Sequence, residues 1–385
     1  MHDVVIIGGG PGGLYAAREL SASGFDVVVL EEHSQIGSPV HCTGILGADA
    51  YTEFDLPRNA VLNQLRTARF YSPLGQTFEY TPDRIEAVVV DRKVFDETLK
   101  LQAVAAGATI APESRAVSIA MDSDAATVGL ADRSVKARAC ILACGANYVL
   151  QRMLGLGTPS VFLHSAQAEL PVQCDAEEVE IHFGSAIAPK GFAWVVPVRR
   201  GASHYVRVGL MSDGNPAALF RDFVEAVSDR WGIRDVPLTA PRRKVLPLAP
   251  ISRTFGDRLL VIGDAADLVK PTTGGGIYYS IVSAGLAAQV LAECLRSDDL
   301  DCNALAKYEN HWRKRLDPEL KIQLAFRKYG QRLTDNDMEQ LFDLVRTDGV
   351  IPLLRKAADF NQQRGLILSL FRHKQFREIF LRTLT

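Results

Sequence analysis

The chain has 385 residues, of which 47% are hydrophobic and 23% are charged, and its formal net charge at pH 7 is −2. This composition is typical of a soluble globular protein, with room for one large domain or two to three interleaved domains. The near-neutral charge gives no electrostatic basis for a nucleic-acid partner, which usually requires a basic face.

No apolar run approaches the roughly 18–20 residues that span a bilayer. Met1 leads directly into a predicted strand, so we expect no signal peptide. The six cysteines contain no CxxC pair, which favours reduced thiols and a cytoplasmic location over a disulfide framework. The eight histidines show no HExxH spacing, and we therefore expect no protein-bound metal.

Residues 3–31, DVVIIGGGPGGLYAARELSASGFDVVVLE, predict a buried strand, a glycine-rich turn, a helix and a second strand. In GxGxxG, Gly8 permits the tight turn, Gly10 lets a pyrophosphate approach the backbone, and Gly13 lets the helix pack closely. Glu31 ends the second strand, where it is placed to accept hydrogen bonds from an adenosine ribose. The complete order of parts predicts a dinucleotide site, and the acid at this position favours FAD or NAD over NADP.

Residues 259–288, LLVIGDAADLVKPTTGGGIYYSIVSAGLAA, predict a second strand, loop and helix that return to the first sheet. Asp264 follows the strand, where a carboxylate can hold the ribityl hydroxyls of a flavin. Pro271 and the glycines at 274–276 lead into a helix from about Ile277. The start of that helix offers free N–H groups and a positive dipole end to an electron-rich ring edge.

A third segment, residues 88–108, places Arg92 just after a short apolar strand and at the start of another helix. Alone, this arginine is a surface charge at a helix start. Together, the three segments resemble the FAD-binding core of the p-hydroxybenzoate hydroxylase-like flavoproteins. Within that superfamily, the chain most resembles the geranylgeranyl reductases.

Four sequence motifs carry this resemblance. The segment GDAADLVKPTTGGGIYYS is similar to the family signature GDAAGxxxPxxGxGIYYA, with Asp267 where the family has glycine. GFAWVVP at 191–197 resembles the family's aromatic-x-Trp-x-x-Pro motif, and SPVHCTG at 38–44 resembles its PxxC segment. LAKYENHWRKRL at 305–316 resembles the helix after the flavin segment, so the resemblance covers about residues 1–316.

The resemblance implies an α/β fold in which a Rossmann-type FAD-binding domain is interleaved with an antiparallel-sheet substrate domain and followed by a helical region. We expect the FAD-binding domain at 1–150 and 251–300. Segments such as AEEVEIHFG and HYVRVGLM alternate in polarity and predict the strands of a substrate-binding sheet at 151–250. The C-terminal helical region then covers 301–385.

The resemblance also implies which residues contact FAD. Cys42 and Gly44 lie beside the flavin in this interpretation, and the Cys42 thiol either donates the proton that completes alkene reduction or lines an apolar site. The full set of expected FAD-binding residues is Gly8, Gly10, Pro11, Gly12, Gly13, Glu31, Glu32, Cys42, Gly44, Arg92, Ala116, Gly263, Asp264, Pro271, Gly274, Gly276 and Ile277.

An apolar channel for the substrate is expected beside the flavin. Phe192, Trp194 and Pro197 would form its wall, although Trp194 also fits a core tryptophan of a sheet. Tyr278 and Tyr279 are further candidates, with one facing the flavin and the other the sheet. A channel for a polyisoprenyl chain is itself an apolar core with a gap, so the structural and substrate-binding interpretations are compatible.

The resulting functional hypothesis is an FAD-dependent reductase that saturates C=C bonds of an isoprenoid, geranylgeranyl-type chain by hydride transfer from reduced flavin. Its substrate is a hydrophobic isoprenoid small molecule or lipid. The alternative on the same fold is a flavin-dependent monooxygenase or halogenase. A third hypothesis is a flavoprotein without catalysis that binds lipid or a partner protein.

The electron donor stays open between NAD(P)H and ferredoxin, the latter being an electron-donor protein. Flavin hydroxylases usually carry an Asp-Gly motif where this chain reads ILACGANYVLQRMLGL, with Cys144 in place of the acid. The C-terminal segment RGLILSLFRHKQFREIFLRTL predicts a basic amphipathic helix. Such a helix fits either peripheral contact with a membrane or packing on the protein itself.

Overall fold

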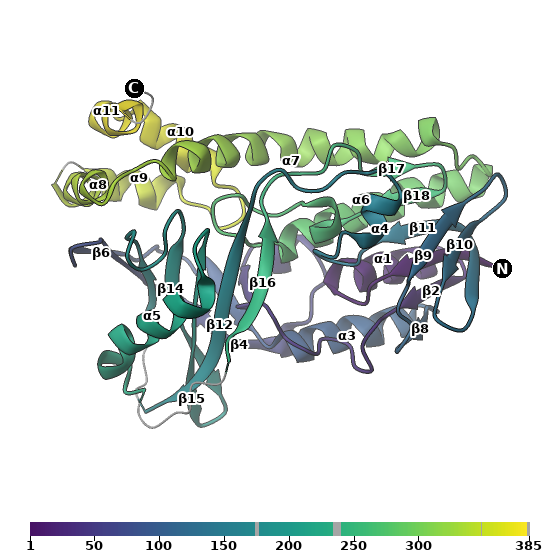
Figure 1. Ribbon diagram of the computed structural model, residues 1–385, viewed down its shortest axis with the longest axis horizontal. Helices are drawn as coiled ribbons and strands as arrows, with labels where there is room; N and C mark the ends of the chain where they lie inside the picture. The colour runs from purple at the N-terminus through teal and green to yellow at the C-terminus, as the bar shows by residue number, and fades with distance from the viewer. Residues whose placement is uncertain (174–176, 234–239, 348, 383–385) are drawn as a thin grey trace.

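The largest sheet is built around the strands predicted at the N-terminus. The computed structural model describes residues 1–173, 177–233, 240–347 and 349–382, and its first sheet has the order β17-β18-β11-β1-β2-β8, with β10 and β9 attached to β11 (Figure 1). The neighbours from β18 to β8 run parallel. The strands are β1 (His2–Ile7), β2 (Val27–Leu30), β8 (Thr109–Ala111), β9 (Ser118–Met121), β10 (Ala126–Gly129), β11 (Ser134–Leu142), β17 (Phe255–Gly256) and β18 (Leu259–Val261).

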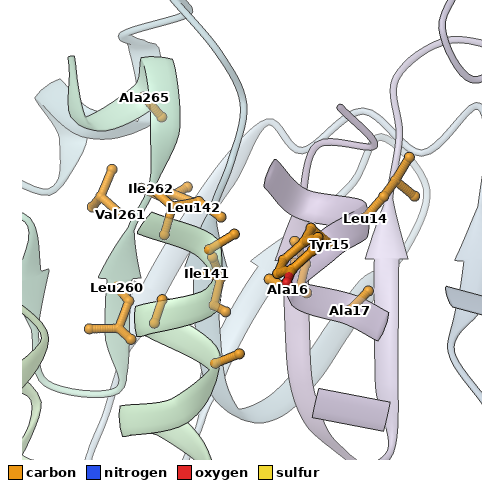
Figure 2. Close-up of a cluster of buried hydrophobic side chains, with 14 of the residues drawn as sticks. Leu14, Tyr15, Ala16, Ala17, Ile141, Leu142, Leu260, Val261, Ile262 and Ala265 are labelled. Carbon is orange, nitrogen blue, oxygen red and sulfur yellow. The ribbon is translucent and has the colours of Figure 1, made fainter. Parts of the chain in front are cut away.

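The late strand β18 lies beside β11, with Leu142 opposite Val261, which confirms that the segment after residue 250 returns to the first sheet. The helices around this sheet are α1 (Pro11–Ala22), α3 (Arg92–Ala105) and α6 (Ile277–Ser297), and α1 packs against both others. Side chains of α1, β11 and β18 gather in one buried apolar cluster (Figure 2). The first sheet is therefore the Rossmann-type core that the sequence predicts.

The second sheet has the order β16-β12-β15-β14-β13-β5-β6. Its strand pairs are antiparallel, as predicted, except that β13 runs parallel to β5. Helix α5 (Pro216–Trp231) covers one face. The strands are β5 (Ala68–Tyr71), β6 (Thr77–Tyr80), β12 (Phe162–Val172), β13 (Val179–His182), β14 (Phe192–Arg200), β15 (Ser203–Ser212) and β16 (Arg242–Pro247).

Residues 68–80 join the second sheet, although they lie within the range expected for the FAD-binding domain; the domain boundaries themselves stay a prediction. A third sheet, β3-β7-β4, lies between the two larger ones and shares a core with the second sheet's inner face. Its strands are β3 (Ile45–Gly47), β4 (Val61–Leu65) and β7 (Ala87–Val90). The short helices of the chain are α2 (Ala50–Glu53), η1 (Arg58–Ala60), α4 (Val149–Met153) and η2 (Gly263–Ala266).

The C-terminal part is helical, as predicted. Helix α7 extends from the first sheet toward the end of the molecule where the last four helices gather (Figure 1). The apolar residues of the C-terminal segment, among them Ile379 and Phe380, pack in a cluster of their own with α7 and α8. These helices are α7 (Cys302–Gly330), α8 (Asp335–Thr347), α9 (Val350–Ala357), α10 (Arg364–Arg372) and α11 (Lys374–Arg382).

One helix of the described residues, α6, is long and apolar enough to cross a membrane by length and composition. This differs from the sequence-based expectation of no such run. However, 78% of its apolar window is buried inside the protein. A buried core helix passes the same test, since it is apolar on all sides.

Candidate functional site

A cavity of about 760 Å³ lies between the first and second sheets. Among the parts of the chain that line it are the turn after β1, the segment 37–45, inward-facing strands of the second sheet, and the loop from Gly263 to Ile277. Its volume is within the usual range for a cofactor or ligand site, about 300–1,000 Å³. The carboxyl ends of β1, β2 and β11 meet at this edge, where ligands bind in open α/β sheets.

The glycine-rich turn is shaped for backbone contact with a ligand. A Cβ on Gly13 would lie 2.0 Å from the Gly8 carbonyl oxygen, and a Cβ on Gly8 would lie 2.4 Å from the Ala143 oxygen. A Cβ on Gly10 would meet no atom within 4 Å, because that residue borders the cavity. Helix α1 begins here without a side-chain cap, so its first N–H groups and its positive dipole end are available to an anion.

Glu31 is held at the cavity by the backbone around it. Its Oε2 accepts a hydrogen bond from Gly9 N at 2.8 Å, and its Oε1 accepts one from His33 N at 2.9 Å. Glu32, also predicted, lines the cavity and forms a 3.6 Å ion pair with Arg115. Both acids therefore border the cavity beside the glycine-rich turn, and their contact with an adenosine ribose stays a prediction.

The loop after β18 brings an acid and an unpredicted lysine together. Asp264 lines the cavity, and its Oδ2 lies 2.9 Å from the Nζ of Lys244 on β16. The Asp264 carboxylate raises the pKa of Lys244 above its ordinary value. Gly276, the N-cap of α6, needs to be glycine because a Cβ there would lie 2.5 Å from Asp264 Oδ1. Helix α6, like α1, has no side-chain cap.

Cys42 lies in the cavity wall on a segment that several polar contacts fix. Its sulfur accepts a hydrogen bond from Gly44 N at 3.3 Å. Arg207 of β15 donates to the Thr43 oxygen at 2.6 Å, which ties the segment to the second sheet. Arg92 also lines the cavity and pairs with Asp96 at 2.8 Å. Burial opposes the charge on Arg92, but Asp96 and Cys42 raise its pKa overall.

The inner face of the second sheet supplies an apolar wall. Phe192 and Trp194 of β14 line the cavity with their ring centroids 5.7 Å apart. The buried Nε1 of Trp194 has no hydrogen-bond partner among the described residues. Ile181 and Leu246 extend the wall. The cavity thus combines a polar, glycine-rich side with an aromatic and aliphatic side.

Four predicted site residues are not among those that line this cavity. Strand alternation turns Pro197 to the face of β14 opposite Trp194. The Tyr278 hydroxyl donates to Glu53 at 2.7 Å, and the Tyr279 hydroxyl accepts from Gln323 at 3.3 Å. Both tyrosines therefore connect α6 to other elements of the protein. The fourth residue, Pro271, accepts a hydrogen bond at its carbonyl from Arg327.

The remaining predicted residues line the cavity, and the structure adds others that sequence reasoning missed. These include Ser165, Gln167, Lys244, Leu246 and Phe360. They come from strands or loops whose neighbours are distant in sequence, so no local signal marks them.

Cys144 borders the cavity too, and burial raises the pKa of its thiol to about 11. Five cysteines are free thiols, as predicted, while Cys174 lies outside the described residues.

The donor set of the cavity fits a dinucleotide. Uncapped helix starts at α1 and α6 suit a pyrophosphate and an electron-rich ring edge, and the open space at Gly10 leaves room for phosphate oxygens. Glu31 and Asp264 also line the cavity, and their carboxylates can accept hydrogen bonds from sugar hydroxyls. No group of three or more His, Cys, Asp or Glu side chains suited to a metal occurs among the described residues.

Comparison with known proteins shows which proteins this chain is similar to. The family model described as lycopene cyclase protein matches residues 3–341. Digeranylgeranylglycerophospholipid reductase 2 of Methanothermobacter thermautotrophicus is 32% identical over 355 residues, which cover 88% of this chain and 90% of the relative.

Solved structures show the same fold. A geranylgeranyl bacteriochlorophyll reductase-like protein from Thermoplasma acidophilum has a TM-score of 0.84 at 24% identity, covering 98% of this chain and 99% of that one. The halogenase PltM in complex with phloroglucinol and FAD has a TM-score of 0.70 at 17% identity, covering 98% and 91%. The chain therefore belongs to the geranylgeranyl reductase family of FAD-dependent oxidoreductases.

Proposed function

We propose that this protein uses FAD to saturate carbon–carbon double bonds in the isoprenoid chain of a lipid. The observation that carries the proposal is the single cavity in which a glycine-rich dinucleotide turn, Cys42 and the aromatic wall of Phe192 and Trp194 lie together. A polar half suited to a cofactor and an apolar half suited to a hydrocarbon are what this reaction requires.

The lining residues suggest how FAD is held. The N–H groups at the start of α1 and the backbone at Gly10 would bind the pyrophosphate, and Glu31 the adenosine ribose. Asp264 would accept hydrogen bonds from the ribityl chain. The start of α6 at Ile277 and the segment that carries Cys42 and Gly44 would hold the flavin ring. Residues Glu32, Arg92 and Ala116 border the same cavity and would complete the contacts.

Bound FAD in its reduced form supplies a hydride to one carbon of the alkene. The protein's own contribution is to hold the alkene against the cofactor, because a fixed geometry removes much of the entropic cost of the reaction. Phe192 and Trp194 supply the apolar surface for this purpose and exclude water. The Cys42 thiol would then give its proton to the second carbon, and solvent would reprotonate the sulfur.

A prenyl lipid is the substrate class that the relatives favour. The relative that is 32% identical carries the name digeranylgeranylglycerophospholipid reductase 2. Similarity to the halogenase is below 25% identity and supports the fold alone. The apolar wall of the cavity agrees with a hydrocarbon chain as the part of the substrate that reacts.

The test begins with FAD-loaded protein that is reduced with dithionite and kept free of oxygen. Addition of a digeranylgeranyl phospholipid should restore the absorbance of oxidised flavin, while the fully saturated lipid should not. Oxygen consumption coupled to hydroxylation or halogenation of a substrate would instead support the monooxygenase or halogenase alternative. FAD binding without turnover in either assay would favour a lipid-binding protein.

The electron donor is either NAD(P)H or a ferredoxin-type protein. In hydroxylases of this fold an acid stands where this chain has Cys144, and that acid is associated with handling of NADPH. This departure removes one argument for NADPH and leaves both donors open. Anaerobic reduction of the FAD-loaded protein by ferredoxin but not by NADH or NADPH would identify ferredoxin as the donor, whereas rapid reduction by NADPH alone would identify NADPH.

Contact with a membrane surface stays a prediction. The apolar face of α10 and α11 packs inside the protein, which leaves the exposed Leu368 and Leu381 and the basic residues Arg372 and Lys374 for a lipid surface. Cosedimentation with anionic vesicles but not with neutral vesicles would support the contact. Equal recovery in the supernatant with both would contradict it.

A further inference from the structure

Lys270 is a buried cation directly before the loop that leads into α6. It is only 2% exposed. Its Nζ donates to the Phe360 carbonyl oxygen at 2.7 Å and to Asn361 Oδ1 at 2.9 Å, and it lies 4.2 Å from the Phe360 ring centroid. No carboxylate of the described residues forms an ion pair with it. The charge is therefore solvated by neutral groups alone.

The lysine lies immediately behind the cavity wall. Its backbone closes the glycine turn, since Lys270 N donates to the Gly275 oxygen at 3.1 Å and Gly274 N donates to the Lys270 oxygen at 2.9 Å. A Cβ on Gly275 would lie 3.7 Å from the Lys270 Cδ and 3.9 Å from its Cε. Gly274, Gly275 and Phe360 all line the cavity. The Lys270 side chain therefore lies next to glycine backbone and an aromatic ring that both belong to the cavity wall.

A buried charge without a fixed counter-ion is costly, and an anion that binds nearby reduces the cost. Burial lowers the pKa of Lys270 to about 7, while Asp49, Asp359 and Glu319 act at longer range to raise it. An additional negative charge in the cavity would therefore favour the protonated lysine. Reduction of flavin by two electrons and one proton adds one negative charge to the ring.

We propose that Lys270 is the counter-charge for reduced FAD, held behind the glycine turn so that it stabilises the reduced over the oxidised cofactor. This inference rests on the proposed FAD site. The positive end of α6 acts at the same place, and the two contributions add. Lys270 would be a positioning and electrostatic residue, because it does not line the cavity and touches neither cofactor nor substrate.

The experiment compares the midpoint potential of FAD in the wild type, Lys270→Met and Lys270→Arg, each loaded with FAD and equilibrated against a reference dye. Lys270→Met keeps the volume and removes the charge, so the preference for reduced over oxidised FAD should fall at least tenfold. For a two-electron couple this is a midpoint potential lower by about 30 mV. Lys270→Arg keeps the charge and should stay within threefold of the wild type.

An unchanged potential in Lys270→Met would overturn the proposal, as would an equal fall in Lys270→Arg, which would show a packing effect rather than a charge effect. Lys270→Gln replaces the methionine variant if the latter does not fold, with the same expected fall. A wild type that does not bind FAD at all would instead refute the proposed function. The two failures are therefore distinguishable.

Discussion

Lys244 on β16 and Asp264 in the loop after β18 place their charged groups 2.9 Å apart at the cavity wall. Their elements belong to different sheets, so this pair joins the apolar wall to the loop that ends at the start of α6. It also orients the carboxylate that we assign to the ribityl chain. Both side chains are partly exposed to the cavity, and the pair itself should contribute little to stability, about 0–1 kcal/mol.

Replacement of Asp264 by alanine should weaken FAD binding about tenfold or more. Hydrogen bonds to a charged acceptor contribute about 1.5–3 kcal/mol each, and alanine removes all of them. Titration of the apoprotein with FAD, followed by flavin fluorescence, measures the change. Asp213→Ala is the control, because its partner Lys190 and the aspartate itself do not border the cavity. Wild-type affinity in the Asp264 variant would contradict the assignment.

Two glycines of the N-terminal turn should respond differently to the same substitution. Gly10→Ala should leave thermal stability of the apoprotein unchanged, because a Cβ there meets no atom within 4 Å, yet it should weaken FAD binding at least tenfold by occupying the phosphate space. Gly13→Ala should destabilise the protein by about 1–3 kcal/mol or more, because its Cβ would lie 2.0 Å from the Gly8 oxygen.

Thermal unfolding without FAD and FAD titration separate these effects. Normal FAD affinity in Gly10→Ala would place the pyrophosphate elsewhere. Undiminished stability in Gly13→Ala would mean that α1 can shift away from the turn.

Cys42→Ala should slow alkene reduction by a factor of about 10²–10⁴, the usual contribution of a positioned general acid. Reduction of the bound flavin by dithionite should still go to completion, because the thiol takes no part in that step. A single-turnover measurement of flavin reoxidation by the prenyl lipid tests this. Cys302→Ala, at the start of α7, controls for loss of a thiol in general. A normal rate in Cys42→Ala would assign the proton to an ordered water or another group.

Asp267 should make stability depend on pH. It is fully buried, its Oδ1 accepts from the Tyr148 hydroxyl at 2.6 Å, and burial raises its pKa from 3.8 to about 7. The folded protein therefore binds more protons than the unfolded chain between pH 4 and 7. Stability from this group falls as pH rises through that window, by about 1.4 kcal/mol for each pH unit.

Asp267→Asn removes this dependence and suits the left-handed backbone, where φ is 56°. The variant should equal the wild type near pH 4 and exceed its stability above pH 7, as urea unfolding at both values would show. A constant difference between the two proteins across this range would contradict the raised pKa.

The sequence allowed prediction of units that are local in the chain. The strand, glycine turn and helix from β1 to α1 lie within residues 2–22, and Gly8 and Gly13 have a steric reason that the pattern reveals. The return of β18 to the first sheet followed from the same logic, because a buried strand that ends in Asp264 repeats the arrangement of the first. The aromatic wall followed from a family motif.

Contacts between distant segments were not predictable in this way. In the sequence, Lys244 is one of several basic residues in a short run, and nothing distinguishes it from its neighbours. Only the pairing of β16 with β12 turns it toward Asp264. The two tyrosines of α6 follow directly after a lining residue, but successive helix positions rotate by about 100° and carry both rings to other partners. Residues 68–80 form a hairpin that joins the second sheet through a parallel pair, which no local pattern marks.

The most direct test of the central claim is the product of one turnover. Protein loaded with FAD and reduced in the absence of oxygen should convert a digeranylgeranyl phospholipid into a species that carries two more hydrogens, with one double bond saturated for each reduced flavin consumed. Mass spectrometry of the extracted lipid counts these hydrogens. An unaltered lipid alongside flavin that stays reduced would contradict the assignment of this protein as a prenyl-lipid reductase.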